Sequence, residues 1–331
     1  MSPQAAEDPR RWRRRAITVP LTFLAATIVL CLASLLLLVA LIDALRGSRF
    51  AWTRALACVG WLVLCESAGL VGAGALGLLR PLLGQARFIA GNYALQRLWG
   101  ATLMGGILRI FAMRLVVEGD EAARSGPFLL LVRHVSTGDA ILPLVCVAWR
   151  HGLWPRYVLK AELRWDPCLD VVGARVPNAY VRRGRGRSEV ERSAALAEGL
   201  GPRDFIVLYP EGTRFSAGRR ERRIAELTER GDPLAERARA ITHTIPPRTG
   251  AALGVLGRAG ALDVVFLAHV GFESVRTLAD LFSGAPIGRT IAVKLWRVPA
   301  AAIPGGDAAR RSWLFAQWAE VDAWVAARSG A

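Results

Sequence analysis

Residues 128–150 read FLLLVRHVSTGDAILPLVCVAWR. The first five, Phe128–Val132, form a continuous apolar run of the kind found in a strand that is covered on both faces. Turn-forming residues follow at 136–138, and the apolar stretch Ala140–Arg150 is long enough for a helix. Similar short runs, separated by turns and helical stretches, recur beyond Met113. This pattern predicts an α/β domain.

The other predicted elements follow the same reasoning. Charged residues dominate the helical stretch Arg219–Arg239, and Gly231-Asp232-Pro233 is expected to break it. Further strands are expected at Arg114–Glu118, Tyr157–Leu159, Ala179–Arg182, Phe205–Leu208, Val264–Ala268 and Ile291–Leu295, and further helices at Glu189–Gly199 and Arg219–Arg239.

Two long apolar runs precede this domain. No charge interrupts Ala16–Ile42, which exceeds the roughly 20 residues that a helix needs to cross the hydrocarbon core. Ala55–Leu79 holds one charge, Glu66, and is rich in glycine, which lets helices pack closely in lipid. Because their connection is short, residues 16–80 are predicted to form a transmembrane helical hairpin. A signal peptide is the competing interpretation of the first run, although its apolar core is usually only about 7–15 residues.

The net charge is +16, and Lys160 and Lys294 are the only lysines. Nucleic acid is one partner for such a charge. With a membrane hairpin predicted, anionic lipid headgroups and phosphorylated substrates explain the charge more economically, so no nucleic acid is expected. Arginines flanking the hairpin favour a cytoplasmic tail at residues 1–15 and a cytoplasmic catalytic domain. The bias towards arginine, alanine and glycine suggests a bacterial inner membrane.

The cysteines and three of the four histidines show no spacing that is typical of a functional site. The five cysteines have no metal-ligand spacing, so they are predicted to be reduced packing residues and no metal is expected. His151, His243 and His269 have no acidic residue at motif spacing and are predicted to be bystanders.

His134 follows the predicted strand, and Asp139 lies five positions later, directly before the apolar helix. In a continuous helix the two side chains would point about 140° apart, but residues 136–138 favour a turn that could bring the carboxylate back to the imidazole. The carboxylate would then fix the ring tautomer and leave the other nitrogen to take a proton. Taken alone, the pair is better explained by an ordinary histidine beside a helix-capping aspartate.

A second cluster changes this balance. The strand Phe205–Leu208 runs directly into Tyr209-Pro210-Glu211-Gly212-Thr213-Arg214, which places polar residues at a strand end, where α/β proteins bind ligands. Arg214 offers a planar fork for a phosphate, and Gly212 lets the backbone approach a ligand closely. A surface turn with an ion pair is the alternative interpretation.

Together these residues resemble the glycerolipid acyltransferases typified by 1-acylglycerol-3-phosphate acyltransferase. That family's first motif, a histidine and an aspartate separated by four residues, matches His134 to Asp139, and its third matches Tyr209 to Arg214. The second motif is similar to Tyr180-Val181-Arg182-Arg183, with Arg183 at the place of the family arginine. Arg133 replaces the asparagine that is common before the histidine, and the second-motif glycine and fourth-motif proline are missing. These departures leave acceptor and acyl-chain selectivity open.

The resemblance implies a fold and an organisation. It implies a mixed sheet flanked by helices over residues 113–300, preceded by the transmembrane hairpin. Residues 81–112 would form an interfacial helix or a helix packed on the domain, and both interpretations are equally supported. Independently of the resemblance, the tryptophans within residues 301–331 are explained by an amphipathic C-terminal helix.

The resemblance also implies a reaction. An acyl group would move from acyl-CoA or acyl carrier protein to the hydroxyl of a lysophospholipid, first of all 1-acylglycerol-3-phosphate, at a lipid bilayer and without a cofactor. His134 would be the general base and Asp139 its orienting partner. N–H groups around Val135 and Ser136 are candidates to receive the oxyanion. Another lysolipid such as lysophosphatidylinositol is the close alternative acceptor, and a non-catalytic protein that binds anionic lipid is the alternative from another class. The acceptor would be bound by Arg183, Glu211, Gly212, Thr213 and Arg214.

Overall fold

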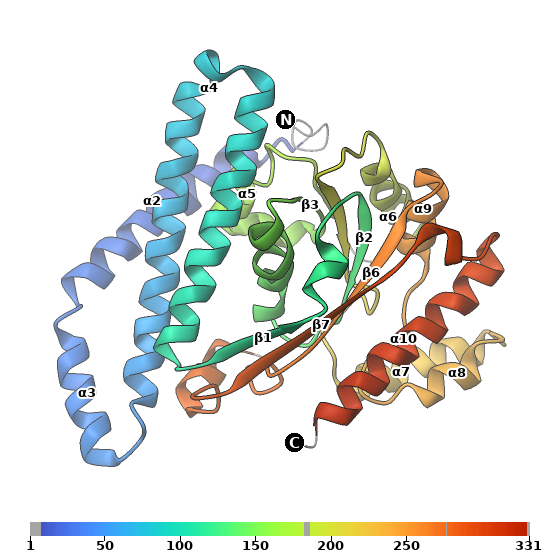
Figure 1. The fold of residues 1–331 in the computed structure, drawn as a ribbon. Helices are drawn as coiled ribbons and strands as arrows, with labels where there is room; N and C mark the ends of the chain where they lie inside the picture. The colour runs from blue at the N-terminus through green and yellow to red at the C-terminus, as the bar shows by residue number, and fades with distance from the viewer. Residues whose placement is uncertain (1–7, 182–185, 276, 330–331) are drawn as a thin grey trace.

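The computed structural model describes residues 8–181, 186–275 and 277–329. Its centre is a seven-stranded sheet in the order β1-β7-β6-β2-β5-β3-β4 (Figure 1). Neighbouring strands run parallel except β6 and β7, so the sheet is mixed, as the resemblance implied. The strands are β1 (Arg114–Glu118), β2 (Phe128–Val132), β3 (Trp154–Lys160), β4 (Ala179–Val181), β5 (Asp204–Leu208), β6 (Asp263–Val270) and β7 (Thr290–Val298).

Helices cover both faces of this sheet (Figure 1). Leu130 of β2 points into a core shared with α4 (Ala51–Ile110) and η3 (Pro143–Trp149). Leu129 and Leu131 point into a core shared with α9 (Gly250–Ala259) and α10 (Asp307–Ser329). This alternation explains why β2 is apolar throughout. The helices of the domain are α5 (Pro167–Val171), α6 (Arg187–Ala194), α7 (Ala217–Glu229), α8 (Ala235–Ala240), α9 (Gly250–Ala259) and α10 (Asp307–Ser329). Shorter elements are the π-helix η3 (Pro143–Trp149) and the 3₁₀ helices η1 (Asp120–Ala123), η2 (Gly138–Ile141), η4 (Ala161–Trp165), η5 (Ala195–Ala197), η6 (Leu278–Ser283) and η7 (Ala300–Ala302).

The first apolar run does not form one helix. It is divided between α2 (Arg11–Cys31) and α3 (Leu35–Arg46), so the prediction of a single helix over Ala16–Ile42 is wrong. The break lets both segments pack against α4 (Ala51–Ile110). The approach of α2 to α4 is close at Gly60, where an added Cβ would lie 3.1 Å from Cγ1 of Val29.

The helix α4 is itself bent into two antiparallel arms (Figure 1). The bend is at Gly84, whose φ of 68° and ψ of 169° are not helical and favour glycine. The arms approach closely at Gly72, where an added Cβ would lie 2.8 Å from Leu95. The second arm packs on the domain, with Tyr93 stacked on Trp154 at 4.9 Å between ring centroids. The second arm of α4 therefore packs on the domain, and its position at a membrane interface stays a prediction.

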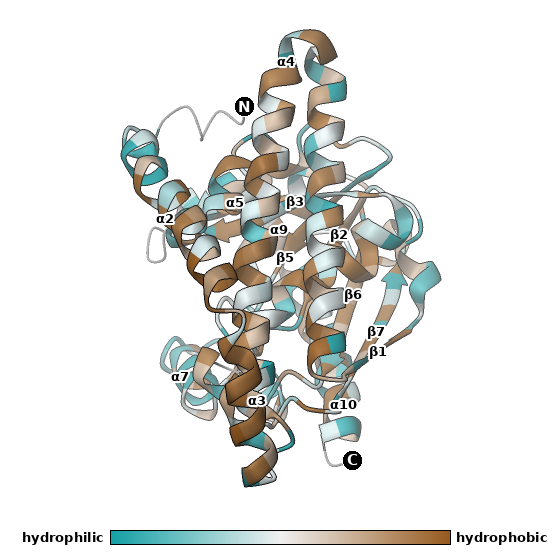
Figure 2. Cartoon of the chain, turned by 90° about the vertical axis from the view of Figure 1, so that its left-hand side faces the viewer, coloured by the Kyte–Doolittle hydropathy of each residue, from teal (hydrophilic) through white to brown (hydrophobic). Residues whose placement is uncertain are grey.

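Two helices of the described part, α2 and α4, are long and apolar enough to cross a membrane. Their most apolar windows are only 17% and 28% buried in the structure. Figure 2 shows this side of the molecule, where apolar residues follow α2, α3 and α4. Leu37 and Leu45 of α3 and Leu78 of α4 are among the most exposed leucines. By length, composition and exposure, these helices are compatible with membrane association.

Candidate active site

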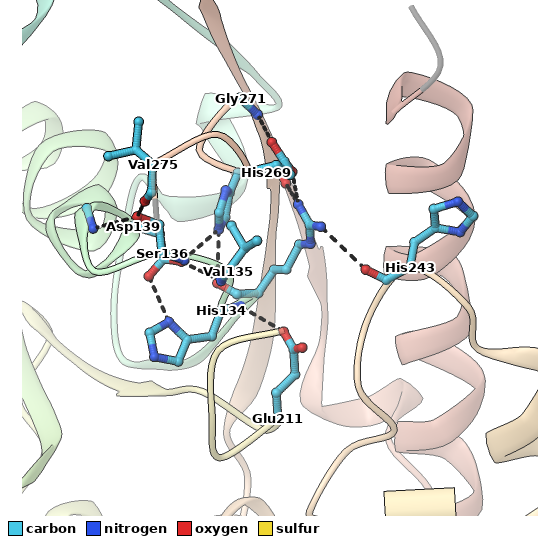
Figure 3. Close-up of polar contacts among 12 residues, drawn as sticks. His134, Val135, Ser136, Asp139, Glu211, His243, His269, Gly271 and Val275 are labelled. Atoms are coloured by element: carbon cyan, nitrogen blue, oxygen red, sulfur yellow. Dashed lines mark hydrogen bonds and ion pairs between the residues drawn. The ribbon is translucent and has the colours of Figure 1, made fainter. Parts of the chain in front are cut away.

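Three neighbouring strands place the candidate site at one edge of the sheet. The strand β2 pairs in parallel with β5 on one side and with β6 on the other. His134 follows β2 directly, Glu211 follows β5, and His269 lies near the end of β6. Because the carboxyl ends of parallel strands meet at one edge, side chains distant in the sequence converge there. Figure 3 shows this convergence.

His134 and Asp139 form the contact that the sequence predicts. The turn η2 brings the carboxylate back, so that Nδ1 of His134 lies 2.9 Å from Oδ1 of Asp139. Oδ2 accepts hydrogen bonds from the backbone of Val135 at 2.6 Å and of Ser136 at 2.7 Å. Asp139 therefore accepts from residues that precede it and does not act as a simple helix cap. The explanation of the pair as an ordinary histidine beside a capping aspartate does not fit this geometry.

The charge state of Asp139 follows from these contacts. Burial by itself would raise the pKa of this carboxyl, but the hydrogen bond from His134 and the nearby His269 and Ser136 outweigh it, and the net pKa is lowered. An ionised carboxylate only accepts hydrogen bonds, so Nδ1 of His134 carries the proton. The lone pair is thereby left on Nε2, on a side chain that is 16% exposed.

The backbone N–H groups proposed for the oxyanion are already engaged. Those of Val135 and Ser136 both donate to Asp139, so they are not available to a reacting carbonyl. The hydroxyl of Ser136 donates to the carbonyl oxygen of Val275 and accepts from the backbone of Gly138 at 3.1 Å. Ser136 is thus held as part of the turn, which agrees with a structural role.

Glu211 is fully buried and contacts the backbone of His134. Its Oε1 accepts from the backbone N–H of His134 at 2.7 Å, and its Oε2 accepts from that of Ile245 at 2.9 Å. Burial raises the pKa of this carboxyl to about 8, against the lowering effect of the two N–H donors. Because both oxygens face the backbone, this geometry favours a positioning role over the acceptor contact expected from the sequence.

The loop that follows Glu211 lies beside the turn of His134. Nη1 of Arg214 donates to Oγ1 of Thr137 at 2.9 Å, and Thr213 lies half-buried in the same loop. Gly212 adopts a φ of 66°, where glycine is favoured, and is exposed. The backbone of Phe215 donates to the carbonyl oxygen of His134 at 2.8 Å, which joins the loop to the base. The Tyr209 ring lies 4.8 Å from the imidazole, centroid to centroid.

The second motif begins on the edge strand β4. The Tyr180 hydroxyl donates to the carbonyl oxygen of Leu169 at 2.9 Å, and the Arg164 guanidinium lies 4.2 Å from the centre of the Tyr180 ring. Arg183 lies outside the described residues, so its predicted contact with the acceptor stays a prediction.

His269 was missed by the sequence interpretation. It is fully buried, and its Nε2 lies 3.7 Å from Oδ2 of Asp139 and 3.0 Å from the carbonyl oxygen of Arg133. The sequence interpretation, which took His269 for a bystander, did not anticipate this contact with Asp139. The signal that could have found it is the sheet register, because Val132 pairs with Leu267, two residues before His269.

The other two histidines lie apart from this contact. The ring of His151 is 3.3 Å from Asp120, and that of His243 contacts the hydroxyl of Thr242 at 2.8 Å. Within the described ranges, no three His, Cys, Asp or Glu side chains are grouped so that they could hold a metal ion.

Comparisons with known proteins agree with the motifs. Residues 114–256 match the model of the acyltransferase family. The mouse 1-acyl-sn-glycerol-3-phosphate acyltransferase epsilon is 26% identical over 173 residues, which cover 51% of this chain and 42% of the relative. This chain thus spans less than half the length of that relative.

The fold has a counterpart among solved structures. The 1-acyl-sn-glycerophosphate (LPA) acyltransferase PlsC from Thermotoga maritima matches with a TM-score of 0.56 and 16% identity, over 84% of this chain and 98% of that one. The two proteins therefore share a fold. With the motifs, the family match and this fold together, the chain carries a domain of the acyltransferase family at residues 114–256.

Proposed function

We propose that this chain is an O-acyltransferase that moves a fatty acyl group from a thioester to the free hydroxyl of a lysophospholipid. The observation that carries this proposal is the 2.9 Å contact of His134 with the buried Asp139, within an acyltransferase domain. Both named relatives are acyltransferases of a 1-acylglycerophosphate. This supports 1-acylglycerol-3-phosphate as the acceptor, giving phosphatidate.

The proton movement follows from the tautomer of His134. Its Nε2 takes the proton of the acceptor hydroxyl as the hydroxyl oxygen attacks the thioester carbonyl carbon. The tetrahedral intermediate then collapses, the C–S bond breaks, and the imidazolium returns the proton to the leaving thiolate. Asp139 stabilises the imidazolium between these steps, and such general-base catalysis typically contributes about 10²–10⁴-fold in rate.

The Arg214 guanidinium is the group that we propose to bind the phosphate of the acceptor. A guanidinium forms charge-assisted, often bidentate, hydrogen bonds with phosphate. Its hydrogen bond to Thr137, within the turn that joins His134 to Asp139, couples the phosphate site to the base. A phosphate held there would bring the acceptor hydroxyl towards Nε2 and lower the entropic cost of the reaction. Arg183 is the second proposed phosphate ligand.

The apolar helices support a membrane location, where both the acceptor and the product reside. α2, α3 and the first arm of α4 present leucines to the outside, which is favourable only where lipid or protein covers them. We place this face in a bilayer, with the catalytic domain on the cytoplasmic side of a bacterial inner membrane, as the flanking arginines favour.

The test is acyl transfer by the purified full chain in phospholipid vesicles. Release of free thiol from acyl-CoA should depend on added 1-acylglycerol-3-phosphate, and mass spectrometry should detect phosphatidate. The same assay with lysophosphatidylinositol, and with acyl carrier protein as donor, identifies both substrates. His134→Ala should abolish turnover while the protein stays folded. Thiol release that does not depend on any added acceptor, or that persists in His134→Ala, would contradict the proposal.

A further inference from the structure

The two residues at the end of β2 have every backbone hydrogen-bonding group engaged. The N–H of Arg133 donates to the carbonyl oxygen of Leu267 at 3.1 Å, and the carbonyl oxygen of His134 accepts from Phe215 at 2.8 Å. The two remaining groups, the carbonyl of Arg133 and the N–H of His134, belong to one peptide bond. Buried backbone groups need partners, and here the ladder with the neighbouring strands has already ended.

On both sides of this peptide bond, side chains take the place of the hydrogen bonds between neighbouring strands. From the β6 side, Nε2 of His269 lies 3.0 Å from the carbonyl oxygen of Arg133. From the β5 side, Oε1 of Glu211 accepts the N–H of His134 at 2.7 Å. Both side chains are fully buried, and Figure 3 shows them on either side of the chain at His134.

The donor in the first of these bonds can be assigned from chemistry. A carbonyl oxygen only accepts, so the proton lies on Nε2 of His269, and its buried Nδ1 has no hydrogen-bond partner among the described residues. The charged groups around this imidazole are Asp139, Arg133 and Glu273. Burial lowers the pKa of His269 to about 4, so the ring is neutral near pH 7.

We propose that His269 and Glu211 are positioning residues that clamp the Arg133–His134 peptide bond from opposite sides and thereby aim Nε2 of His134. The inference rests on the proposed function, because it assigns a task to the base. Asp139 holds the ring at Nδ1, and the clamp holds the backbone from which the ring projects. With both ends held, the direction of the remaining nitrogen is fixed before substrate binds.

The physical consequence is a specific kinetic signature. A peptide unit that is held on one side only can tilt, and a displacement of about 1 Å at a reacting group can cost roughly 10²-fold in rate. Both clamp side chains are fully buried, whereas the His134 side chain is 16% exposed, so neither clamp residue is accessible to substrate. Loss of the clamp should therefore lower kcat and leave the KM of both substrates unchanged.

The kinetic test compares three replacements of His269. Leucine removes the N–H donor, asparagine keeps a donor but shortens its reach, and glutamine can place an amide N–H near the carbonyl oxygen of Arg133. We expect kcat to fall about 10- to 100-fold in His269→Leu and His269→Asn, and to be largely restored in His269→Gln. His243→Gln is the matched control and should behave as the wild type. Should His269→Leu not fold, the asparagine and glutamine variants decide.

A second readout does not depend on activity. The chain has only four histidines, so a spectrum of protein labelled with ¹⁵N-histidine is simple, and His134→Gln assigns the signals of His134. In His269→Asn these signals should shift or broaden, and in His269→Gln and His243→Gln they should not. If the wild type acylates no acceptor, the proposed function fails, while this spectrum still decides whether the clamp exists.

Two results would overturn the clamp. One is a wild-type kcat in His269→Leu or His269→Asn, or a kcat in His269→Gln as low as in His269→Leu. The other is a lowered thermal midpoint without any change in the His134 signals, which would mean that His269 only stabilises the fold.

Discussion

Arg133 and His269 exchange hydrogen bonds across the strands β2 and β6. Nη1 of Arg133 donates to the carbonyl oxygen of His269 at 2.5 Å, and Nε2 of His269 donates to the carbonyl oxygen of Arg133 at 3.0 Å. The same guanidinium pairs with Glu273 at 2.6 Å. Each residue thus uses its side chain to hold the other's backbone. Arg133 therefore does more than replace the asparagine that the resemblance led us to expect.

Replacing Arg133 by methionine should destabilise the protein by about 2–3 kcal/mol, because hydrogen bonds to a charged group and the ion pair with Glu273 are lost. Methionine keeps the aliphatic volume, so packing changes little. Denaturant unfolding in detergent measures the effect, with Arg222→Met, at an exposed position of α7, as the control. An unchanged midpoint in Arg133→Met would show that the exchange adds nothing to stability.

Replacing Asp139 by asparagine should lower kcat by roughly 10³- to 10⁴-fold, the scale seen when a histidine base loses its orienting carboxylate. The amide cannot accept from Nδ1 of His134 and from the N–H groups of Val135 and Ser136 together. Steady-state kinetics with saturating donor and acceptor measure kcat. Asp263→Asn, at the other end of β6 and paired with Arg297, is the matched control. Near-normal turnover in Asp139→Asn would remove the carboxylate from the mechanism.

The stability of the protein should depend on pH through Glu211. Its pKa is raised by burial from 4.5 to about 8, so between these values the folded state holds a proton that the unfolded state has lost. This group's contribution is therefore fully present below pH 4.5 and is lost as the pH rises towards 8. The thermal midpoint of the wild type should fall more steeply over this range than that of Glu211→Gln. Glu221→Gln, at an exposed site, should follow the wild type. Parallel curves for wild type and Glu211→Gln would contradict the expectation.

Replacing Arg214 by alanine should raise the KM for 1-acylglycerol-3-phosphate by about 10- to 100-fold, the equivalent of one or two lost bonds to a charged group. The KM for acyl-CoA should change little. Lysine should restore part of the binding, since it keeps the charge and loses the planar fork. Arg222→Ala serves as the surface control. An equal rise in both KM values would argue that Arg214 holds the loop and does not contact the phosphate.

Local pattern predicted much of the domain. Phe128–Val132 and Arg114–Glu118 are strands with the predicted limits, and the break at Gly231-Asp232-Pro233 separates α7 from α8. The strand β3 begins at Trp154, earlier than predicted, because Pro155 obscured a segment that pairs with β5. Ser34 is the only polar residue in the interruption between Cys31 and Leu35. Because both flanks are apolar and both helices contact α4, the sequence pattern alone did not predict the break.

The site was predictable where its residues are close in sequence. His134 and Asp139 meet through a local turn, so spacing and turn chemistry predicted their contact. The contacts of Glu211 and His269 with the backbone around His134 depend on the order of β5, β2 and β6 in the sheet, which sequence periodicity does not reveal. For the same reason, the occupied N–H groups of Val135 and Ser136 became apparent only with the carboxylate in place.

The bend at Gly84 sets where the candidate site lies relative to the apolar N-terminal helices. A straight helix of 60 residues would be about 90 Å long and would carry the start of β1 far from Ala51. Because α4 is bent, its last residue lies close to its first turn, and the Arg54 guanidinium donates to the carbonyl oxygen of Ile110. In the proposed membrane location, this fold would hold the candidate site beside the start of α4, at a constant height above the leaflet from which the acceptor would come.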